Sequence, residues 1–176
     1  MKNIILSLWF ATIFTSSFAQ CEDGRYRNFI FSDYTVTANQ LYGSNFDLNG
    51  DNVELFVDIY EPAGDTQTDR PLIVIAHGGT FISGSRTGSD VVPLCQDLSR
   101  MGYVVASMSY RLGLPLSLNL QQPATEAVVR GFHDMKAAIR YFRKDVAENG
   151  NNYNIDPDEI YAAGVSAGAS GAFASF

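Results

Sequence analysis

The stretch Ile160-Tyr161-Ala162-Ala163-Gly164-Val165-Ser166-Ala167-Gly168 decides the fold of this chain. Its first six residues are small or mostly apolar, as in a strand that is covered on both faces, and the small residues from Ala167 onward permit a helix. Residues 164–168 fit the pattern G-x-S-x-G, in which a serine occupies a strained turn between a strand and a helix. A tight turn or a serine N-cap is the structural alternative. The context favours Ser166 as a nucleophile that projects from the carboxyl end of a sheet.

Apolar strands alternate with helices in the residues before this motif. Residues 72–76 are continuously apolar, which is typical of a strand covered on both faces, and residues 103–108 are the next expected buried strand. Residues 89–100 and 125–147 have the pattern of helices. The apolar stripe of the longer helix consists of Val128, Phe132, Met135, Ile139 and Phe142.

Two earlier strands complete the predicted sheet. Residues 35–43 and 53–60 flank Asn49-Gly50, a strong signal for a tight turn between antiparallel strands. An opening hairpin followed by alternating strands and helices predicts an α/β sandwich with a mostly parallel sheet. Because no repeat or linker divides residues 20–176, we expect them to form one domain.

A second motif, His77-Gly78-Gly79, directly follows strand 72–76. A glycine pair just beyond a buried strand can turn two backbone N–H groups toward one concavity. Ester cleavage needs such donors, because negative charge develops on the carbonyl oxygen. A flexible loop or a phosphate cradle is the alternative, and the phosphate cradle is disfavoured because neither phosphate-binding glycine pattern occurs.

The two motifs, together with the sequence DIYEP at residues 58–62, resemble the α/β-hydrolase fold. More narrowly, they resemble its secreted carboxylesterases and lipases of the HGG oxyanion-hole type. The resemblance covers most of residues 35–176. It implies an α/β-hydrolase sandwich with a mostly parallel central sheet and an antiparallel opening hairpin, here ending just after the nucleophile elbow.

The same resemblance implies roles for the motif residues. Ser166 would be the nucleophile that forms an acyl-enzyme. The backbone N–H groups of Gly78, Gly79 and Ala167 would form the oxyanion hole. His77 would shape this loop rather than carry protons.

One part of the family pattern is missing. The family places an acidic residue and then a histidine after the serine, but residues 167–176 contain neither. The chain's two histidines are His77 and His133, and His133 has the position of an ordinary helix histidine. A serine without a base is a poor nucleophile. We therefore expect the chain to be the amino-terminal part of a longer enzyme and to be nearly inactive by itself.

The amino-terminal residues have the pattern of a secretory signal peptide. Lys2 precedes an apolar stretch, and small residues follow up to a cleavage site after Ala19. The apolar stretch, residues 4–14, is too short to span a bilayer comfortably, although an uncleaved anchor is the alternative. This pattern predicts a secreted or periplasmic protein with no membrane anchor after cleavage. In that compartment Cys21 and Cys95 are candidates for a disulfide, against the alternative of two independent cysteines.

Composition excludes several classes of function. A net charge of −7 and a pI of about 4.6 argue against nucleic-acid binding, which needs clustered basic residues. Two cysteines cannot build a four-thiolate zinc site. Residues 47–51 begin like a calcium loop, but Asn52 and Asp58 stand where such loops need glycine and glutamate. We expect no metal and no organic cofactor.

The leading hypothesis is a serine hydrolase that cleaves carboxylic esters, with a small-molecule or polymer-linked ester as substrate. A secreted serine peptidase of the same fold is the first alternative. A non-catalytic binding module of that fold is the second. The sequence leaves the acyl and alcohol groups and the oligomeric state open.

Overall fold

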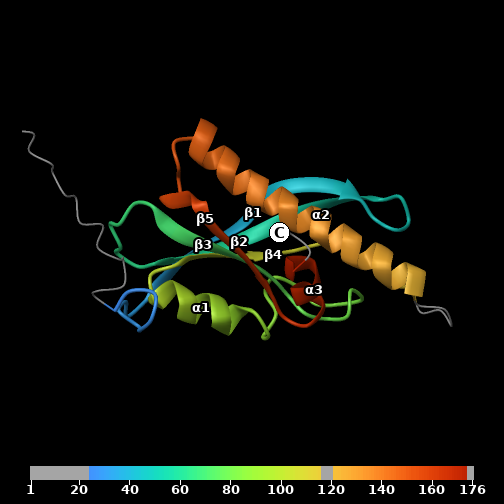
Figure 1. Ribbon diagram of the computed structural model, residues 1–176, viewed down its shortest axis with the longest axis horizontal. Coiled ribbons are helices and arrows are strands. Elements are labelled where there is room, and N and C mark those ends of the chain that lie inside the picture. The colour runs from blue at the N-terminus through green and yellow to red at the C-terminus, as the bar shows by residue number, and fades with distance from the viewer. Residues whose placement is uncertain (1–23, 116–120, 174–176) are drawn as a thin grey trace, which may run out of the picture.

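The computed structural model describes residues 24–115 and 121–173 of the chain. Within these residues the strands are β1 (Tyr34–Phe46), β2 (Asn52–Pro62), β3 (Arg70–Ala76), β4 (Val104–Met108) and β5 (Ile155–Gly164). The helices are α1 (Val92–Arg100), α2 (Gln121–Glu148) and α3 (Ala167–Phe173) (Figure 1). The signal peptide expected at residues 1–19 and Cys21 lie outside the described residues. The signal peptide and the Cys21–Cys95 disulfide therefore stay predictions.

The strands form a single mixed sheet in the order β1-β2-β4-β3-β5. β3 pairs in parallel with both β4 and β5, whereas β2 is antiparallel to β1 and to β4. Only β2 therefore runs against the other strands of the described sheet. The predicted opening hairpin and mostly parallel sheet are confirmed.

The connections from β3 explain where the helices lie. The chain moves from β3 through α1 to β4 on one side, and from β4 through α2 back across β3 to β5 on the other. Because crossovers between parallel strands are right-handed, these opposite moves place α1 and α2 on opposite faces of the sheet (Figure 1). α3 contacts α2, so it lies on the α2 face. The chain therefore leaves the adjacent carboxyl ends of β3 and β5 toward opposite faces, where open α/β sheets bind their ligands.

The opening hairpin has a longer loop than Asn49-Gly50 alone predicts. The Asp47 carboxylate accepts the backbone N–H groups of Asn49 at 2.8 Å and Asp51 at 2.9 Å. Gly50 has a φ of +84°. The hydrogen bond from Asp51, followed by those from the other loop residues, lowers the pKa of Asp47. These bonds fold residues 47–51 into one loop. The Asp47 carboxylate is used there as an acceptor for backbone N–H groups.

Two helices begin at other residues than expected. α1 begins at Val92 instead of residue 89, because Pro93 suits the first turn of a helix and the preceding residues form hydrogen-bonded turns. α2 begins at Gln121 instead of residue 125. β5 also begins earlier, at Ile155, with an irregularity in its register against β3 before Ile160.

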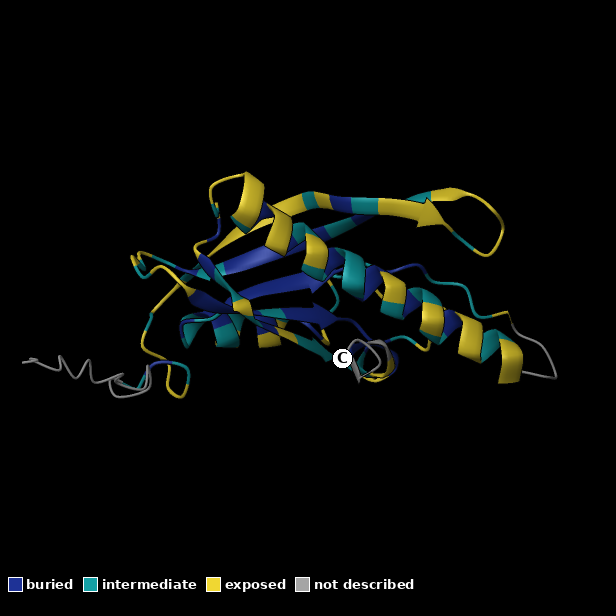
Figure 2. Cartoon of the chain, turned by 45° about the horizontal axis from the view of Figure 1, so that its top comes forward, coloured by how far each residue is buried: buried dark blue, intermediate teal, exposed yellow. Residues whose placement is uncertain are grey.

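The buried face of α2 is rotated relative to the predicted stripe. Met135 and Phe142 are buried as expected, whereas Val128, Phe132 and Ile139 are only partly buried. The buried positions of this helix are Ala127, Gly131, Asp134, Met135, Ala138, Phe142 and Asp145, and they recur along one side of it (Figure 2). Ala127, Gly131 and Ala138 have small side chains or none and let the helix backbone pack closely at these positions. Val128, Phe132 and Ile139 lie at the flanks of this face.

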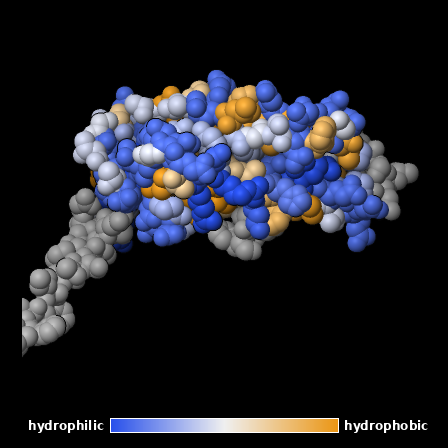
Figure 3. Space-filling view, turned by 90° about the horizontal axis from the view of Figure 1, so that it is seen from above, coloured by the Kyte–Doolittle hydropathy of each residue, from blue (hydrophilic) through white to orange (hydrophobic). Residues whose placement is uncertain are grey.

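Apolar side chains fill both faces of the sheet. The larger core cluster joins the strands to α2 and α3, and a smaller cluster joins them to α1 through Val91 and Cys95. Burial raises the pKa of the Cys95 thiol to about 12. The surface seen in Figure 3 is mostly hydrophilic with scattered apolar residues. Among the described helices, none has the length and apolar character that crossing a bilayer requires.

Candidate active site

Ser166 occupies the turn between β5 and α3. It is exposed and has a φ of +50°. The left-handed conformation costs a residue with a Cβ about 1–2 kcal/mol, so the surrounding structure must hold it in place. The backbone N–H of Val165 donates to the Ala76 carbonyl at 3.0 Å, which ties the start of this turn to the end of β3. Ser166 thus has the strained strand-to-helix geometry that its motif predicts.

The two glycines of the motif are required by close backbone contacts. A Cβ on Gly164 would lie 2.3 Å from the carbonyl carbon of Gly168. A Cβ on Gly168 would lie 2.3 Å from the carbonyl oxygen of Ala76. Any side chain at either position would push α3 away from β5 or β3. The glycines therefore fix how closely α3 packs behind Ser166.

The residues after β3 form a tightly folded turn, which we call the glycine loop (residues 77–84). Gly79 has a φ of +114°, and a Cβ there would lie 2.1 Å from the Ser83 carbonyl oxygen. Thr80 and Phe81 also have positive φ angles, +57° and +59°. The Gly79 carbonyl accepts the N–H of Ser83 at 3.1 Å. This packing and bonding favour a fixed turn over a flexible loop.

The glycine loop lies directly against the turn between β5 and α3 that contains Ser166. A Cβ on Gly78 would lie 3.6 Å from the Ser166 Cβ. The N–H of Gly78, however, donates to the Asp90 carboxylate at 2.7 Å. The N–H groups of Gly79, Thr80 and Ala167 have no hydrogen-bond acceptor in the described part of the chain. Of the three donors expected from the sequence, Gly78 therefore already has another partner here.

Sequence reasoning missed Asp90 and Thr80. Asp90 lies well outside the H-G-G motif, and no periodic pattern links it to Gly78. Thr80 could have been found as the next backbone N–H of the same loop. Its left-handed φ, which a threonine rarely adopts, has no signature in the sequence.

His77 is buried and holds the glycine loop in shape. Its ring stacks on the Tyr110 ring with the centroids 4.4 Å apart, and its Nδ1 lies 2.7 Å from the Gly78 carbonyl oxygen. A carbonyl oxygen can only accept, so Nδ1 carries the proton of this hydrogen bond. The Tyr110 hydroxyl donates to the His77 carbonyl at 2.9 Å. Burial raises the pKa of the Tyr110 hydroxyl to about 12. These contacts support a structural role for His77.

The other histidine lies elsewhere. His133 is exposed on α2, beside the Phe132 ring at a centroid distance of 5.7 Å. In residues 24–115 and 121–173, no hydrogen bond joins the Ser166 hydroxyl to a histidine or a carboxylate. The described site therefore brings together the exposed Ser166 and the backbone N–H groups of the glycine loop.

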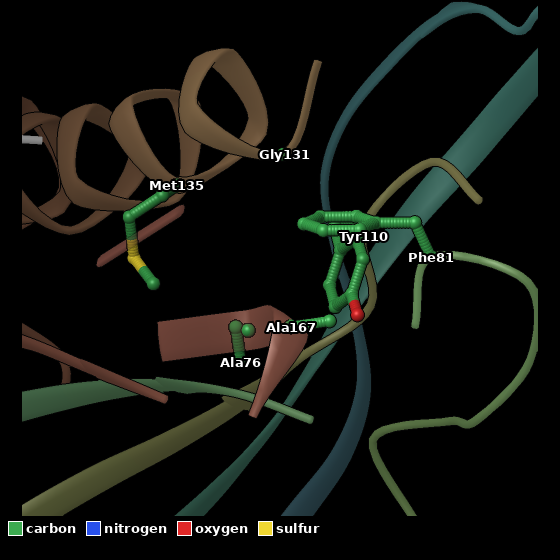
Figure 4. A pocket seen from close by; sticks show the side chains of 7 residues that line it. Ala76, Phe81, Tyr110, Gly131, Met135 and Ala167 are labelled. Carbon is green, nitrogen blue, oxygen red and sulfur yellow. The ribbon is translucent and has the colours of Figure 1, made fainter. Parts of the chain in front are cut away.

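A small apolar cavity lies beside the start of α3, next to the turn that contains Ser166. It is lined by Ala76, Phe81, Tyr110, Gly131, Met135, Ala167 and Gly168 (Figure 4). Its free volume of about 10 Å³ is enough for no more than a single water, and its lining offers few polar partners to hold one. The cavity is thus a packing gap between α2 and the site, too small for an acyl group.

Filling this gap at Gly131 is expected to stabilise the protein. A Cβ there would meet Phe81 at 3.4 Å and Tyr110 at 3.9 Å, which are ordinary contacts. Because alanine also favours a helix interior over glycine, Gly131→Ala should raise the free energy of unfolding by about 1 kcal/mol in urea denaturation. Gly150→Ala is the matched control: Gly150 has a φ of +84°, so alanine there should lower the same quantity by about 1 kcal/mol. A loss of stability in Gly131→Ala would contradict this packing.

Comparison with known proteins agrees with this geometry. The profile of the BD-FAE family matches residues 57–175. Esterase P of Drosophila melanogaster is 32% identical over 137 residues, covering 76% of this chain and 23% of that protein. The bile salt-activated lipase of Rattus norvegicus is 28% identical over 174 residues, covering 95% of this chain and 28% of that protein.

The solved structures that this chain matches are also esterases. The apo form of Thermogutta terrifontis esterase 2 is 32% identical, with a TM-score of 0.55, over 76% of this chain and 42% of that one. The chain thus spans about a quarter of the length of the two curated relatives and less than half of this structure. The family profile, the esterase relatives and the shared fold agree, and the chain belongs to the BD-FAE family of α/β-hydrolases.

Proposed function

We propose that this protein is a carboxylic ester hydrolase with Ser166 as its nucleophile. The observation that carries the proposal is the exposed Ser166 with its φ of +50°, held between β5 and α3 next to the glycine loop. The relatives named above are esterases and a lipase, which favours esters over the peptide bonds of the first alternative. The substrate is a small-molecule or polymer-linked ester, and residues 1–19 would direct the protein out of the cytoplasm.

In the proposed reaction the Ser166 Oγ bonds to the ester carbonyl carbon while a base takes the hydroxyl proton. The carbonyl oxygen becomes an oxyanion, which the N–H groups of Gly79, Thr80 and Ala167 are free to bind. Collapse of this intermediate expels the alcohol, which receives the proton. Water then attacks the acyl-enzyme and releases the acid and Ser166. Gly78 would contribute through its position beside Ser166 and not as a donor.

The base and the carboxylate that orients it are not identified among the described residues. His77 donates its Nδ1 proton to the Gly78 carbonyl and is buried against Tyr110, so its contacts serve the loop. We therefore expect both groups to come from residues outside those that the structure describes. Residues 20–176 produced alone should hydrolyse esters only very slowly.

Labelling with a fluorophosphonate tests this function. The protein expressed from its natural gene should react with the probe in a 1:1 ratio, and peptide mapping by mass spectrometry should place the label on Ser166. Ser170 on α3 is also exposed and is the internal control, since it should stay unlabelled. A natural protein that hydrolyses no ester and carries no label on Ser166 would support the non-catalytic binding module instead.

A further inference from the structure

A carboxylate stands beside the proposed oxyanion donors. Asp90 lies in the turn before α1, and its Oδ2 accepts the N–H of Gly78 at 2.7 Å. Gly78 separates this carboxylate from the nucleophile: a Cβ on Gly78 would lie 3.1 Å from Asp90 Oδ2 and 3.6 Å from the Ser166 Cβ. Asp90 has no part in the proposed chemistry, yet it contacts the segment that supplies the donors.

The turn before α1 is shaped around this carboxylate. A Cβ on Gly88 would lie 2.4 Å from Asp90 Oδ1, so any side chain there would displace the carboxylate. Gly88 donates its N–H to the Ser85 carbonyl at 2.9 Å and accepts the N–H of Val91 at 3.2 Å. Val91 is fully buried under α1. The turn and its buried anchor therefore hold Asp90, although Asp90 itself is exposed.

Asp90 and Tyr110 hold the two polar ends of one peptide group. The peptide between His77 and Gly78 gives its N–H to Asp90, while its carbonyl accepts the Tyr110 hydroxyl at 2.9 Å. The next peptide is held by its carbonyl, because Gly78 O accepts the His77 Nδ1 proton at 2.7 Å. In a trans peptide the N–H and C=O point in opposite directions, so these bonds also fix the direction of the Gly79 N–H.

We propose that Asp90 is a positioning residue of the active site. By clamping the His77–Gly78 peptide it orients the Gly79 N–H toward the oxyanion, without touching the substrate. This inference rests on the proposed function. The carboxylate acts as a hydrogen-bond acceptor of fixed position, so a neutral acceptor of the same shape should largely replace it.

The test compares Asp90→Ala with Asp90→Asn in the protein expressed from its natural gene. For p-nitrophenyl acetate, Asp90→Ala should lower kcat about 10- to 100-fold and leave KM within about twofold, because the donors are misplaced in the transition state. Its affinity for a trifluoromethyl ketone, whose adduct carries the oxyanion, should fall by a similar factor. Asp90→Asn keeps an acceptor oxygen and should regain most of both quantities. Asp97→Ala, which removes an exposed carboxylate on α1, is the matched control and should match the wild type.

A second variant disturbs the hydrogen bond between Gly78 and Asp90 without removing the carboxylate. Gly88→Ala should lower kcat as Asp90→Ala does, and should lower it little further in the Asp90→Ala background, since both act through one hydrogen bond. Wild-type kcat and inhibitor affinity in Asp90→Ala would overturn the proposal. So would equal losses in Asp90→Ala and Asp90→Asn.

Failure of the proposed function would look different. In that case the wild type itself would lack ester hydrolysis and labelling at Ser166. The Gly78 amide proton provides a readout that needs no activity: its NMR signal should lie downfield in the wild type and move upfield in Asp90→Ala. An unchanged signal would show that Asp90 does not hold the glycine loop.

Discussion

Ser166→Ala is expected to lower kcat for p-nitrophenyl acetate about 10⁴-fold or more in the protein expressed from its natural gene, with little change in KM. Removal of the proposed nucleophile leaves only binding and the proposed backbone donors, which retain a small part of the catalysis of such sites. Initial rates over a range of substrate concentrations give both constants. The matched control is Ser170→Ala on α3, which should keep wild-type rates.

The strained backbone at Ser166 can be tested separately, by measuring the free energy of unfolding of variants at this position. Ser166→Gly should be as inactive as Ser166→Ala, but it should raise the free energy of unfolding by about 1 kcal/mol relative to Ser166→Ala, because glycine adopts a φ of +50° without a clashing Cβ. A serine kept at a conformation that costs stability is what a functional requirement would produce. Wild-type hydrolysis in Ser166→Ala would refute the proposed nucleophile, whatever the stability measurements show.

Local patterns were sufficient to predict the mostly parallel sheet and the strand-to-helix turn at Ser166. The strands β3 and β4 are buried and mostly apolar, as expected. β5 lies at the edge of the described sheet, so residues 160–165 are not covered on both faces as their sequence predicts, and Tyr161 is 50% exposed. The glycines around Ser166 mark the close approach of α3 to β5. These features depend on residues that are neighbours in the chain. A single sequence therefore contains the information that fixes them.

The parts that could not be predicted depend on contacts between distant residues. The buried face of α2 includes small residues and two carboxylates, Asp134 and Asp145, that an apolar stripe does not predict, and Val128 and Phe132 lie at its flanks. The hydrogen bond from Gly78 to Asp90 joins two separate turns and has no periodic signature. That bond decides which backbone N–H groups stay available beside Ser166, and the H-G-G motif alone does not show it.

A buried ion pair, also invisible in the sequence, joins α2 to the segment after β4. The Arg111 guanidinium lies 2.7 Å from Asp134 Oδ1, and the Arg111 backbone N–H donates to Asp134 Oδ2 at 2.8 Å. Both side chains are almost fully buried, with exposed fractions of 5% and 2%. Arg111 directly follows Tyr110, which holds the His77 carbonyl. The ion pair thus connects α2 to the segment whose Tyr110 hydrogen-bonds to the glycine loop.

Asp134→Ala is expected to lower the free energy of unfolding by about 3–5 kcal/mol, because it leaves the Arg111 charge buried with two backbone carbonyls as its remaining acceptors. Urea denaturation followed by circular dichroism measures this loss. If Asp134→Ala fails to fold, Asp134→Asn keeps an acceptor for the Arg111 N–H and should show a smaller loss. Glu148→Ala is the matched control, since it breaks an exposed ion pair with Lys144 on the same helix and should cost about 0.5 kcal/mol or less. Equal effects of Asp134→Ala and Glu148→Ala would show that the buried pair does not hold α2 against the segment after β4.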